Sequence, residues 1–246
     1  MPADSGHGQQ SSQSMLKVSD LTSGYRRVAI VQDISFSVNK GEILAVVGRN
    51  GVGKTTLMKA LIGSLRTFVG TIQYKGEDVT GLRPSHRARR GMGYVPQGRG
   101  IFARMSVDEN LSLGAGIGGN GTPANYDRVY DYFPVLKERR SQDAGSLSGG
   151  EQQQLAIGRI LVGRPDLILL DEPSEGIQPN LVQQLGVVIQ RLQDEEGLTV
   201  VIVEQNLDLI RAVADRCVVV DKGTIVAQLS ADEFANPDVA KRYLAI

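Results

Sequence analysis

The feature of this chain that most restricts its fold is a glycine-rich octet placed directly after a short apolar run. The run covers residues 43–47, and the octet reads Gly48-Arg49-Asn50-Gly51-Val52-Gly53-Lys54-Thr55. Glycines at this spacing let the backbone wrap a polyphosphate with its N–H groups pointing inward, and the start of a following helix favours the same anion. The order predicts a buried strand, a phosphate-binding loop and a helix over residues 55–65.

Two side chains at the end of the octet and the one that follows it have expected roles. Lys54 can reach the β and γ phosphates of a nucleotide, and the Thr55 hydroxyl is placed to bind a Mg²⁺ ion that bridges the same oxygens. We expect Thr56 to start the helix and to contact the nucleotide together with the backbone of the octet. The alternative is a turn that merely links a strand to a helix, and Gly-Lys-Thr after an apolar run argues against it.

A second apolar run ends in two carboxylates. Residues 167–170 are consecutive apolar residues, as in a central parallel strand buried on both faces, and Asp171 and Glu172 follow. Ligands of open α/β sheets lie at such strand ends. We expect Asp171 to hold the Mg²⁺ shell and Glu172 to polarise the attacking water as a general base. Without the octet, an acidic turn after a strand would be the simpler interpretation.

A third string, Leu147-Ser148-Gly149-Gly150-Glu151, stands between the other two and opens a helical pattern over residues 151–162. Ser148 suits the N-cap of that helix, and the N–H groups of Gly149 and Gly150 would form an anion-binding helix N-terminus. Taken alone, the string indicates no more than a capped helix.

Together the three strings resemble those of ATP-binding cassette (ABC) proteins, and the resemblance extends from about residue 15 to the C-terminus. It implies an α/β fold with a P-loop NTPase (RecA-like) core, an N-terminal antiparallel β subdomain and a helical lobe. It also implies ATP and Mg²⁺ as cofactors. In that family two cassettes pair head to tail, so Ser148, Gly149 and Gly150 would cap the γ-phosphate held by the other subunit's phosphate loop.

The resemblance assigns two further positions. Tyr25 lies where the family places an aromatic ring against adenine, with simple packing against protein as the alternative. Gln97, in Tyr94-Val95-Pro96-Gln97, matches the glutamine that reaches the metal and water and links the core to the helical lobe. The alternative for Gln97 is a loop amide in solvent.

Two positions depart from the general cassette pattern. Gln205 stands where most cassettes carry a histidine that contacts the γ-phosphate, and Gln178 stands where an aspartate usually communicates across the dimer. A glutamine amide can donate a hydrogen bond to a phosphate oxygen, but it cannot become cationic. We expect weaker charge stabilisation at the site built on this chain's phosphate loop.

These departures resemble the second ATP-binding subunit of importers for branched-chain amino acids, urea and short amides. The strings are Val203-Glu204-Gln205-Asn206, Glu175-Gly176-Ile177-Gln178-Pro179 and Val95-Pro96-Gln97-Gly98-Arg99, and the last two lean toward urea or amides. The implied partners are a sister ATP-binding subunit or a second copy of this chain, two membrane permease subunits and, indirectly, a solute-binding protein. The implied location is the cytoplasmic face of the cell membrane. The alternatives are the ATPase of a lipid or polysaccharide exporter and a soluble ABC-type regulator.

Charge and composition agree with this interpretation. Lys and Arg total 27, as do Asp and Glu, so no electrostatic footprint for nucleic acid is expected. The basic cluster at residues 83–90 is expected to be a solvated loop and helix face, with contact to lipid headgroups or a membrane subunit as the alternative. No apolar run approaches the ~20 residues that cross a bilayer. Cys217, the single cysteine, has apolar neighbours that predict a buried thiol.

One cassette per chain is the expected organisation. Residues 1–14 are expected to form a disordered leader, and residues 15–246 a single domain. Its parts are a core (about 15–96 and 160–230), a helical lobe (about 97–159) and a helical tail (231–246). Short alternating stretches predict antiparallel strands over residues 16–47. The other expected elements are helices at 107–114, 126–133, 181–192 and 207–214, a strand at 199–203, and a hairpin formed by 217–220 and 224–229.

Overall fold

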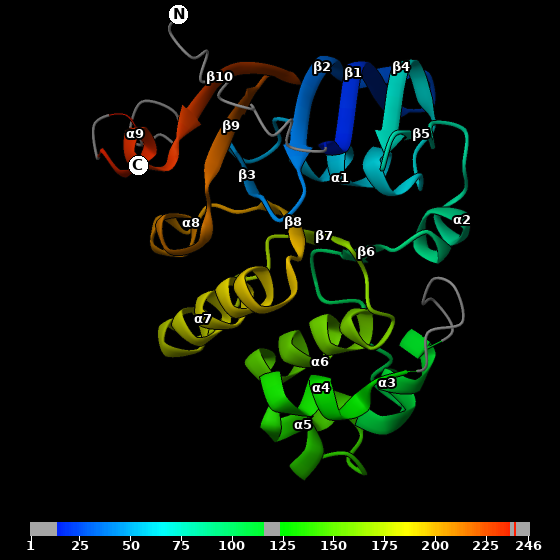
Figure 1. Ribbon diagram of the computed structural model, residues 1–246, viewed down its shortest axis with the longest axis vertical. Coiled ribbons are helices and arrows are strands. Elements are labelled where there is room, and N and C mark those ends of the chain that lie inside the picture. Colours follow the sequence, from blue (N-terminus) through cyan, green and yellow to red (C-terminus); the bar gives the residue numbers. More distant parts are fainter. Residues whose placement is uncertain (1–13, 116–123, 237–238, 240–246) are drawn as a thin grey trace, which may run out of the picture.

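Two β-sheets and a group of helices make up the computed structural model, which describes residues 14–115, 124–236 and 239 (Figure 1). The first sheet is antiparallel, with the order β2-β1-β4-β5. Along β2, Ile34, Phe36 and Val38 are buried and the serines between them are exposed, which is the alternation that a sheet with one covered face requires. The strands are β1 (Ser14–Tyr25), β2 (Val28–Asn39), β4 (Thr67–Tyr74) and β5 (Glu77–Asp78).

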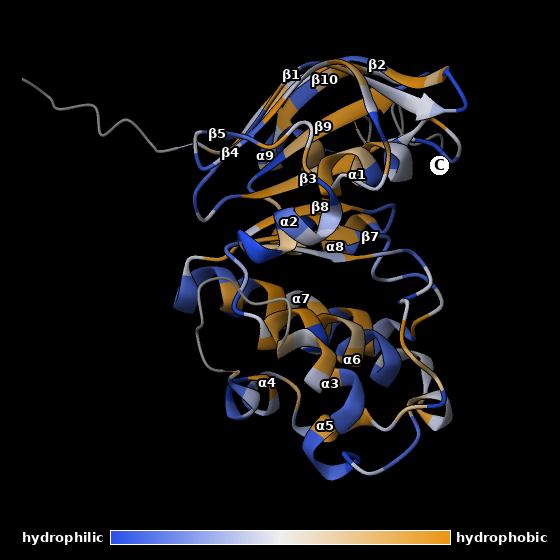
Figure 2. Cartoon of the chain, turned by 90° about the vertical axis from the view of Figure 1, so that its right-hand side faces the viewer, coloured by the Kyte–Doolittle hydropathy of each residue, from blue (hydrophilic) through white to orange (hydrophobic). Residues whose placement is uncertain are grey.

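The second sheet has the order β10-β9-β3-β8-β7-β6, and all of its pairs are parallel except β9 with β10. Every residue of β3, β7 and β8 is buried, so both faces of these strands are covered. The strands are β3 (Ile43–Val47), β6 (Met92–Val95), β7 (Leu167–Asp171), β8 (Thr199–Val203), β9 (Arg216–Asp221) and β10 (Thr224–Ser230). In Figure 2, β3 and β9 are coloured hydrophobic.

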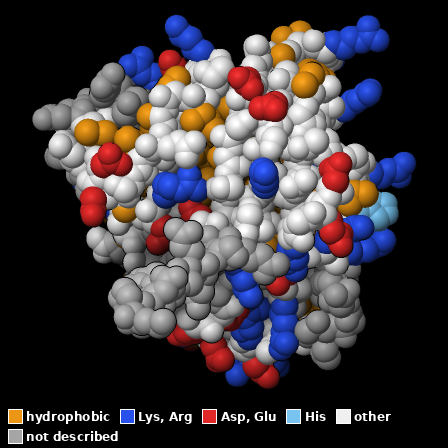
Figure 3. Space-filling model, turned by 45° about the horizontal axis from the view of Figure 1, so that its top comes forward, with side chains coloured by type: hydrophobic (Ala, Val, Ile, Leu, Met, Phe, Trp, Pro, Cys, Tyr) orange, Lys and Arg blue, Asp and Glu red, His pale blue; other side chains and the backbone are white. Residues whose placement is uncertain are grey.

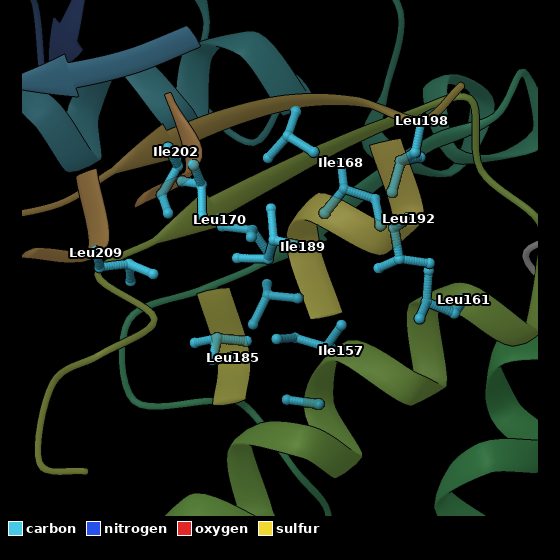
Figure 4. Packing of buried hydrophobic residues seen from close by; sticks show 14 of the residues in the cluster. Ile157, Leu161, Ile168, Leu170, Leu185, Ile189, Leu192, Leu198, Ile202 and Leu209 are labelled. Carbon is cyan, nitrogen blue, oxygen red and sulfur yellow. The ribbon is translucent and has the colours of Figure 1, made fainter. Parts of the chain in front are cut away.

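Alternate residues of the central strands point into two different cores. Ile43 and Val47 of β3 belong to a core with the helices on one side of the sheet, whereas Leu44 and Val46 belong to a core with α1 and the first sheet. Figure 4 shows the first core, in which side chains of α6 and α7 meet those of β7 and β8. Because burying each large aliphatic side chain stabilises the fold by roughly 1.5–3 kcal/mol, these cores fix the strands firmly.

The helices flank the second sheet or form the lobe at one end of the molecule (Figure 1). The lobe contains α3, α4, α5 and α6, and α6 packs against α3 and β6. The helices are α1 (Lys54–Ile62), α2 (Pro84–Arg89), α3 (Val107–Ala115), α4 (Tyr126–Tyr132), α5 (Pro134–Glu138), α6 (Gly149–Val162), α7 (Pro179–Glu196), α8 (Leu207–Val213) and α9 (Ala231–Ala235). None of the described helices is long and apolar enough to cross a membrane.

The α/β fold expected from the sequence is confirmed, as are the buried strand at 199–203, the C-terminal hairpin and the buried Cys217. The antiparallel strands expected over residues 16–47 are confirmed up to Asn39, whereas β3 at 43–47 pairs in parallel with both neighbours. Burial raises the pKa of the Cys217 thiol to about 12. Helix α1 begins at Lys54 and ends at Ile62, where Gly63 with φ 83° caps it, three residues before the expected end. Helix α7 is longer than expected. Strands β4, β5 and β6 and helix α5 were not anticipated, whereas α2 lies in the segment expected to be a loop and helix face.

Several expected boundaries fall at or outside the edges of the described chain. Ser14, the last residue of the expected leader, begins β1, and residues 1–13 lie outside the described residues. The same is true of most of the expected loop at 114–123 and of most of the expected tail beyond α9. The expected limit of the lobe, residue 159, falls within α6, which continues to Val162.

The expectation that residues 83–90 form a solvated face is wrong for Arg87. This side chain is 1% exposed, and its guanidinium donates hydrogen bonds to four backbone carbonyls. Two of them, Ala60 and Leu61, are at the C-terminal end of α1, where helix carbonyls lack the usual donors of the next turn, although the Gly63 N–H also donates to Ala60. Burial lowers the pKa of Arg87 to about 10. On the face shown in Figure 3, basic and acidic side chains are interspersed.

We predict that Arg87→Met lowers the free energy of unfolding by about 3 kcal/mol, because methionine fills the space but leaves buried carbonyls without donors. Urea unfolding followed by circular dichroism measures this change. Arg89→Met, at an exposed position of the same helix, is the matched control. Equal, small effects of the two substitutions would show that water replaces the guanidinium at no cost.

Candidate nucleotide site

A polar cavity of about 690 Å³ opens where three parallel strands end. Val203 of β8 pairs with Val46 of β3 on one side and with Asp171 of β7 on the other. The segments that follow these strands therefore leave the sheet at the same edge, which is where ligands bind in α/β sheets. The lining residues are Ile30, Asn50, Gly51, Gly53, Lys54, Thr55, Thr56, Gln97, Glu172, Ser174, Glu175, Glu204, Gln205 and Asn206.

The octet forms a loop that only glycine permits at its key positions. Gly48, Gly51 and Gly53 have φ values of 150°, 80° and 110°. A Cβ atom at Gly48 would lie 2.2 Å from the Val220 carbonyl oxygen, and one at Gly53 would lie 2.9 Å from a methyl group of Val31. Gly53 caps α1 without any side-chain hydrogen bond to the helix start. No side chain at the cap therefore accepts hydrogen bonds from the first N–H groups of α1. These groups are left to bind an anion.

Lys54 lies folded over this loop. Its Nζ donates hydrogen bonds to the carbonyl oxygens of Gly48 at 2.8 Å and Arg49 at 2.9 Å, and it lies 3.8 Å from Oε1 of Glu172. Burial lowers the pKa of Lys54, and the neighbouring carboxylates oppose that shift, with Glu172 the strongest of them. The ammonium group therefore lies between the loop and Glu172, within reach of a phosphate held by the loop.

Asp171 is buried with both carboxylate oxygens in use. The Thr55 hydroxyl donates to Oδ1 at 3.1 Å, and the Tyr94 hydroxyl donates to Oδ2 at 3.2 Å. Burial raises the pKa of Asp171, and these two hydrogen bonds oppose the shift. Sequence reasoning gave Tyr94 no role, because a tyrosine inside a strand carries no local sign of a partner 77 positions away.

Thr55 and Asp171 form a donor pair that fits Mg²⁺. Both supply hard oxygen atoms, and Mg²⁺ in nucleotide sites is usually held by one or two protein oxygens together with phosphate oxygens and water. Within the described residues no group of three or more His, Cys, Asp or Glu could bind a metal without such help. Gln97 contacts Glu172 and Glu175, so its expected share in metal binding stays a prediction.

Glu172 is held by two amide side chains. Gln97 Nε2 donates to Oε2 at 3.2 Å, and Gln205 Nε2 donates to Oε1 at 2.8 Å. Gln205 Nε2 also donates to Oδ1 of Asn50 at 2.7 Å, which ties it to the phosphate loop. The backbone at Glu172 has φ 51°, a left-handed conformation that costs a residue with a side chain of the order of 1 kcal/mol or more. The carboxylate therefore faces the cavity between the two amides.

Glu204, which sequence reasoning missed, fixes the backbone around this arrangement. Its side chain is 2% exposed, and Oε1 accepts from the N–H groups of Gln205 at 2.7 Å and Asn206 at 2.9 Å. Oε2 accepts from the Ser174 N–H at 3.2 Å. A buried carboxylate is retained where charge-assisted hydrogen bonds satisfy it, and here it joins the segments that carry Glu172 and Gln205.

Four expected nucleotide contacts outside the octet do not line this cavity, and neither do Gly48, Arg49 and Val52 within it. Ser148 caps α6 in a reciprocal arrangement with Glu151, and Gly149 and Gly150 form the first turn of that helix. Tyr25, which is 43% exposed, lines a separate hollow, and its hydroxyl accepts a hydrogen bond from Lys59 Nζ at 3.5 Å. Gln178 is the N-cap of α7 and makes no side-chain capping bond. The Ser-Gly-Gly turn is thus free of this chain's own phosphate loop.

Comparison with known proteins agrees with this geometry. The family model described as ABC transporter matches residues 31–175. The high-affinity branched-chain amino acid transport ATP-binding protein BraG of Pseudomonas aeruginosa is 42% identical, over 94% of this chain and 99% of its own. The lipopolysaccharide export system ATP-binding protein LptB of Haemophilus influenzae is 35% identical, over 93% and 96%. A solved nucleotide-free ATP-binding cassette from an ABC transporter superposes with a TM-score of 0.80 at 25% identity, over 93% and 98%. The chain therefore belongs to the ABC transporter family, as an ATP-hydrolysing cassette.

Proposed function

We propose that this chain powers a membrane importer of the branched-chain amino acid, urea and amide type. The observation that carries the proposal is the position of the Ser148 turn outside the chain's own cavity, which leaves the turn free to complete the site of a second cassette. Gln205 and Gln178, in place of histidine and aspartate, support the importer branch, as does the BraG relative. That relative favours branched-chain amino acids as the solute over urea or amides.

The proposed site binds ATP with Mg²⁺. The phosphates are held by Lys54, Thr55 and Thr56 and by the backbone N–H groups of Gly48, Arg49, Asn50, Gly51, Val52 and Gly53. Tyr25 stacks against adenine. Thr55 and Asp171, with Gln97, hold Mg²⁺, which when bound supplies charge neutralisation at the phosphate oxygens. Tyr94 keeps Asp171 in its orientation, since it donates to the oxygen that Thr55 leaves unoccupied.

Hydrolysis requires a base, a cation near the γ-phosphate and an orienting group. Glu172 accepts a proton from water as the water oxygen attacks the γ-phosphorus and the bond to ADP breaks. Lys54 moves from its loop carbonyls to the phosphate oxygens. Gln97 and Gln205 hold the Glu172 carboxylate from its two sides. The corresponding turn of the paired cassette donates to this γ-phosphate, and Ser148, Gly149 and Gly150 of this chain donate to the γ-phosphate in the partner's site.

The proposed assembly pairs this chain with a sister cassette or a second copy of itself. Two permease subunits bind the pair at the cytoplasmic face of the membrane and convert its closure into solute passage, and a solute-binding protein delivers the solute to them. The second candidate function is the ATPase of a lipid or polysaccharide exporter, which the LptB relatives favour.

The first prediction of this proposal concerns partners. An affinity tag on the chain, followed by mild extraction from native membranes and mass spectrometry, should recover two different permease subunits and a second cassette with histidine at the position of Gln205. Permease-like subunits together with lipopolysaccharide-export components would favour the exporter. Recovery of ribosomal or DNA-repair proteins without a membrane protein would contradict both functions.

A second prediction concerns the base. Glu172→Gln should lower ATP turnover by roughly 10²–10⁴-fold, because an amide cannot take the proton. The affinity for ATP, measured by calorimetry, should stay close to that of the wild type. Glu138→Gln, at an exposed position on α5, is the matched control and should turn over normally. Wild-type turnover in the Glu172 variant would reject its role as base.

A third prediction concerns Gln205. Gln205→His should raise ATP turnover in the isolated complex, because an imidazolium forms a charge-assisted hydrogen bond with the γ-phosphate. The cation is the active form, so the gain should be larger near pH 6 than near pH 8, on either side of the ordinary histidine pKa of about 6.5. Gln184→His on the exposed side of α7 controls for histidine itself. Absence of a gain at both pH values would show that Gln205 is not what limits the rate.

A further inference from the structure

The turn at residues 98–100 has an unusual backbone. Gly98, Arg99 and Gly100 have φ values of 76°, 71° and 61°, so three consecutive residues are left-handed. Glycine adopts this conformation freely, whereas a residue with a Cβ atom rarely does. Arg99 therefore holds a backbone conformation that is costly for a residue with a Cβ atom.

The Arg99 guanidinium joins two segments that are far apart in the sequence. Nη1 donates to Oε1 of Gln152 on α6 at 3.1 Å, and Nη2 lies 3.4 Å from the carbonyl oxygens of Glu175 and Gly176, to which it donates. Gln152 in turn donates from Nε2 to the Leu147 carbonyl oxygen at 3.0 Å. A continuous set of hydrogen bonds therefore runs from the Ser148 turn through Arg99 to the segment that follows Glu172.

The same contact is tightly packed. A Cβ atom at Gly149 would lie 3.0 Å from Arg99 Nη2 and 3.1 Å from the Gly176 carbonyl oxygen. Gln97, two residues before Arg99, donates to the side chains of both Glu172 and Glu175. Residues 97 and 99 thus bind the 172–176 segment at two points, one through side chains and one through backbone carbonyls.

We propose that Arg99 is a positioning residue that holds the Ser148 turn in register with the segment carrying Glu172. The inference rests on the proposed pairing of cassettes. All three acceptors of its guanidinium are neutral oxygens, so the role depends on the forked geometry of arginine. Each cassette then presents its turn to the partner's γ-phosphate at an angle set by its own catalytic segment. None of these contacts touches the phosphate loop, so ATP binding by the single chain does not depend on Arg99.

The test uses Arg99→Gln and Arg99→Gly in the complex isolated through the tagged chain. Both should lower ATP turnover roughly tenfold to hundredfold, because a small misplacement of a positioned group costs that much. The ATP affinity of the single chain should stay within about twofold, and the melting temperature within about 4 °C. Both substitutions remove the guanidinium, but glycine also adopts the left-handed turn without strain. An equal loss in Arg99→Gly and Arg99→Gln therefore assigns the effect to the side chain and not to the backbone. Arg89→Gln, an exposed arginine of α2, is the control.

A second readout does not depend on hydrolysis. In a Glu172→Gln background, ATP should drive pairing of cassettes on size-exclusion chromatography, and Arg99→Gln should weaken that pairing. Unchanged turnover and pairing in both Arg99 variants would overturn the inference. A loss of ATP affinity equal to the loss of turnover would also overturn it, because Arg99 would then act through the chain's own nucleotide site. If the wild-type complex does not hydrolyse ATP, the proposed function itself fails, and this outcome is distinct from the other two.

Discussion

Burial of β3, β7 and β8 on both faces is the constraint on which the rest of the structure depends. Their apolar side chains alternate between two hydrophobic cores, and the polar residues of these strands, Thr199 and Asp171, stand at strand ends. The groups with chemical function therefore gather at one edge of the sheet, in the turns after Val47, Asp171 and Val203. The cores stabilise the fold. The same packing fixes the register of the three strands, so the turns that follow them begin side by side.

The local parts of the site were predictable from the sequence, and the contacts between its parts were not. The octet, the Asp171-Glu172 pair and the Ser148 cap each lie within a few consecutive residues, so glycine spacing, strand burial and capping chemistry identify them. Tyr94 and Arg87 contact partners that folding brings close, which are Asp171 and the end of α1. Glu204 joins its own neighbours to the distant Ser174, and no local pattern marks any of these partners. Arg87 shows the limit most clearly, because a basic cluster normally indicates solvent, yet this one guanidinium replaces water at the end of α1.

The side chains that donate hydrogen bonds to the Glu172 carboxylate are uncharged. Gln97 and Gln205 satisfy its two oxygens with neutral amides, and Lys54 is the cation near it at 3.8 Å. An amide stabilises a carboxylate without adding a proton that could be lost over the physiological range, in contrast to an imidazole. The orientation of Glu172 is thus insensitive to pH as far as its hydrogen-bond donors are concerned. Among the described residues Lys54 is the cation paired with it, and in the proposed mechanism this lysine moves to the phosphate oxygens.

The separation between the Ser148 turn and the chain's own cavity has a consequence for how such a protein changes over time. In the proposed pair each chain contributes to two different ATP sites, with its phosphate loop in one and its turn in the other. A substitution near Lys54 or Gln205 alters one site, and a substitution near Gly149 alters the other. When the partner is a different chain, the two sites can therefore drift toward unequal rates of hydrolysis while the shape of the pair is preserved.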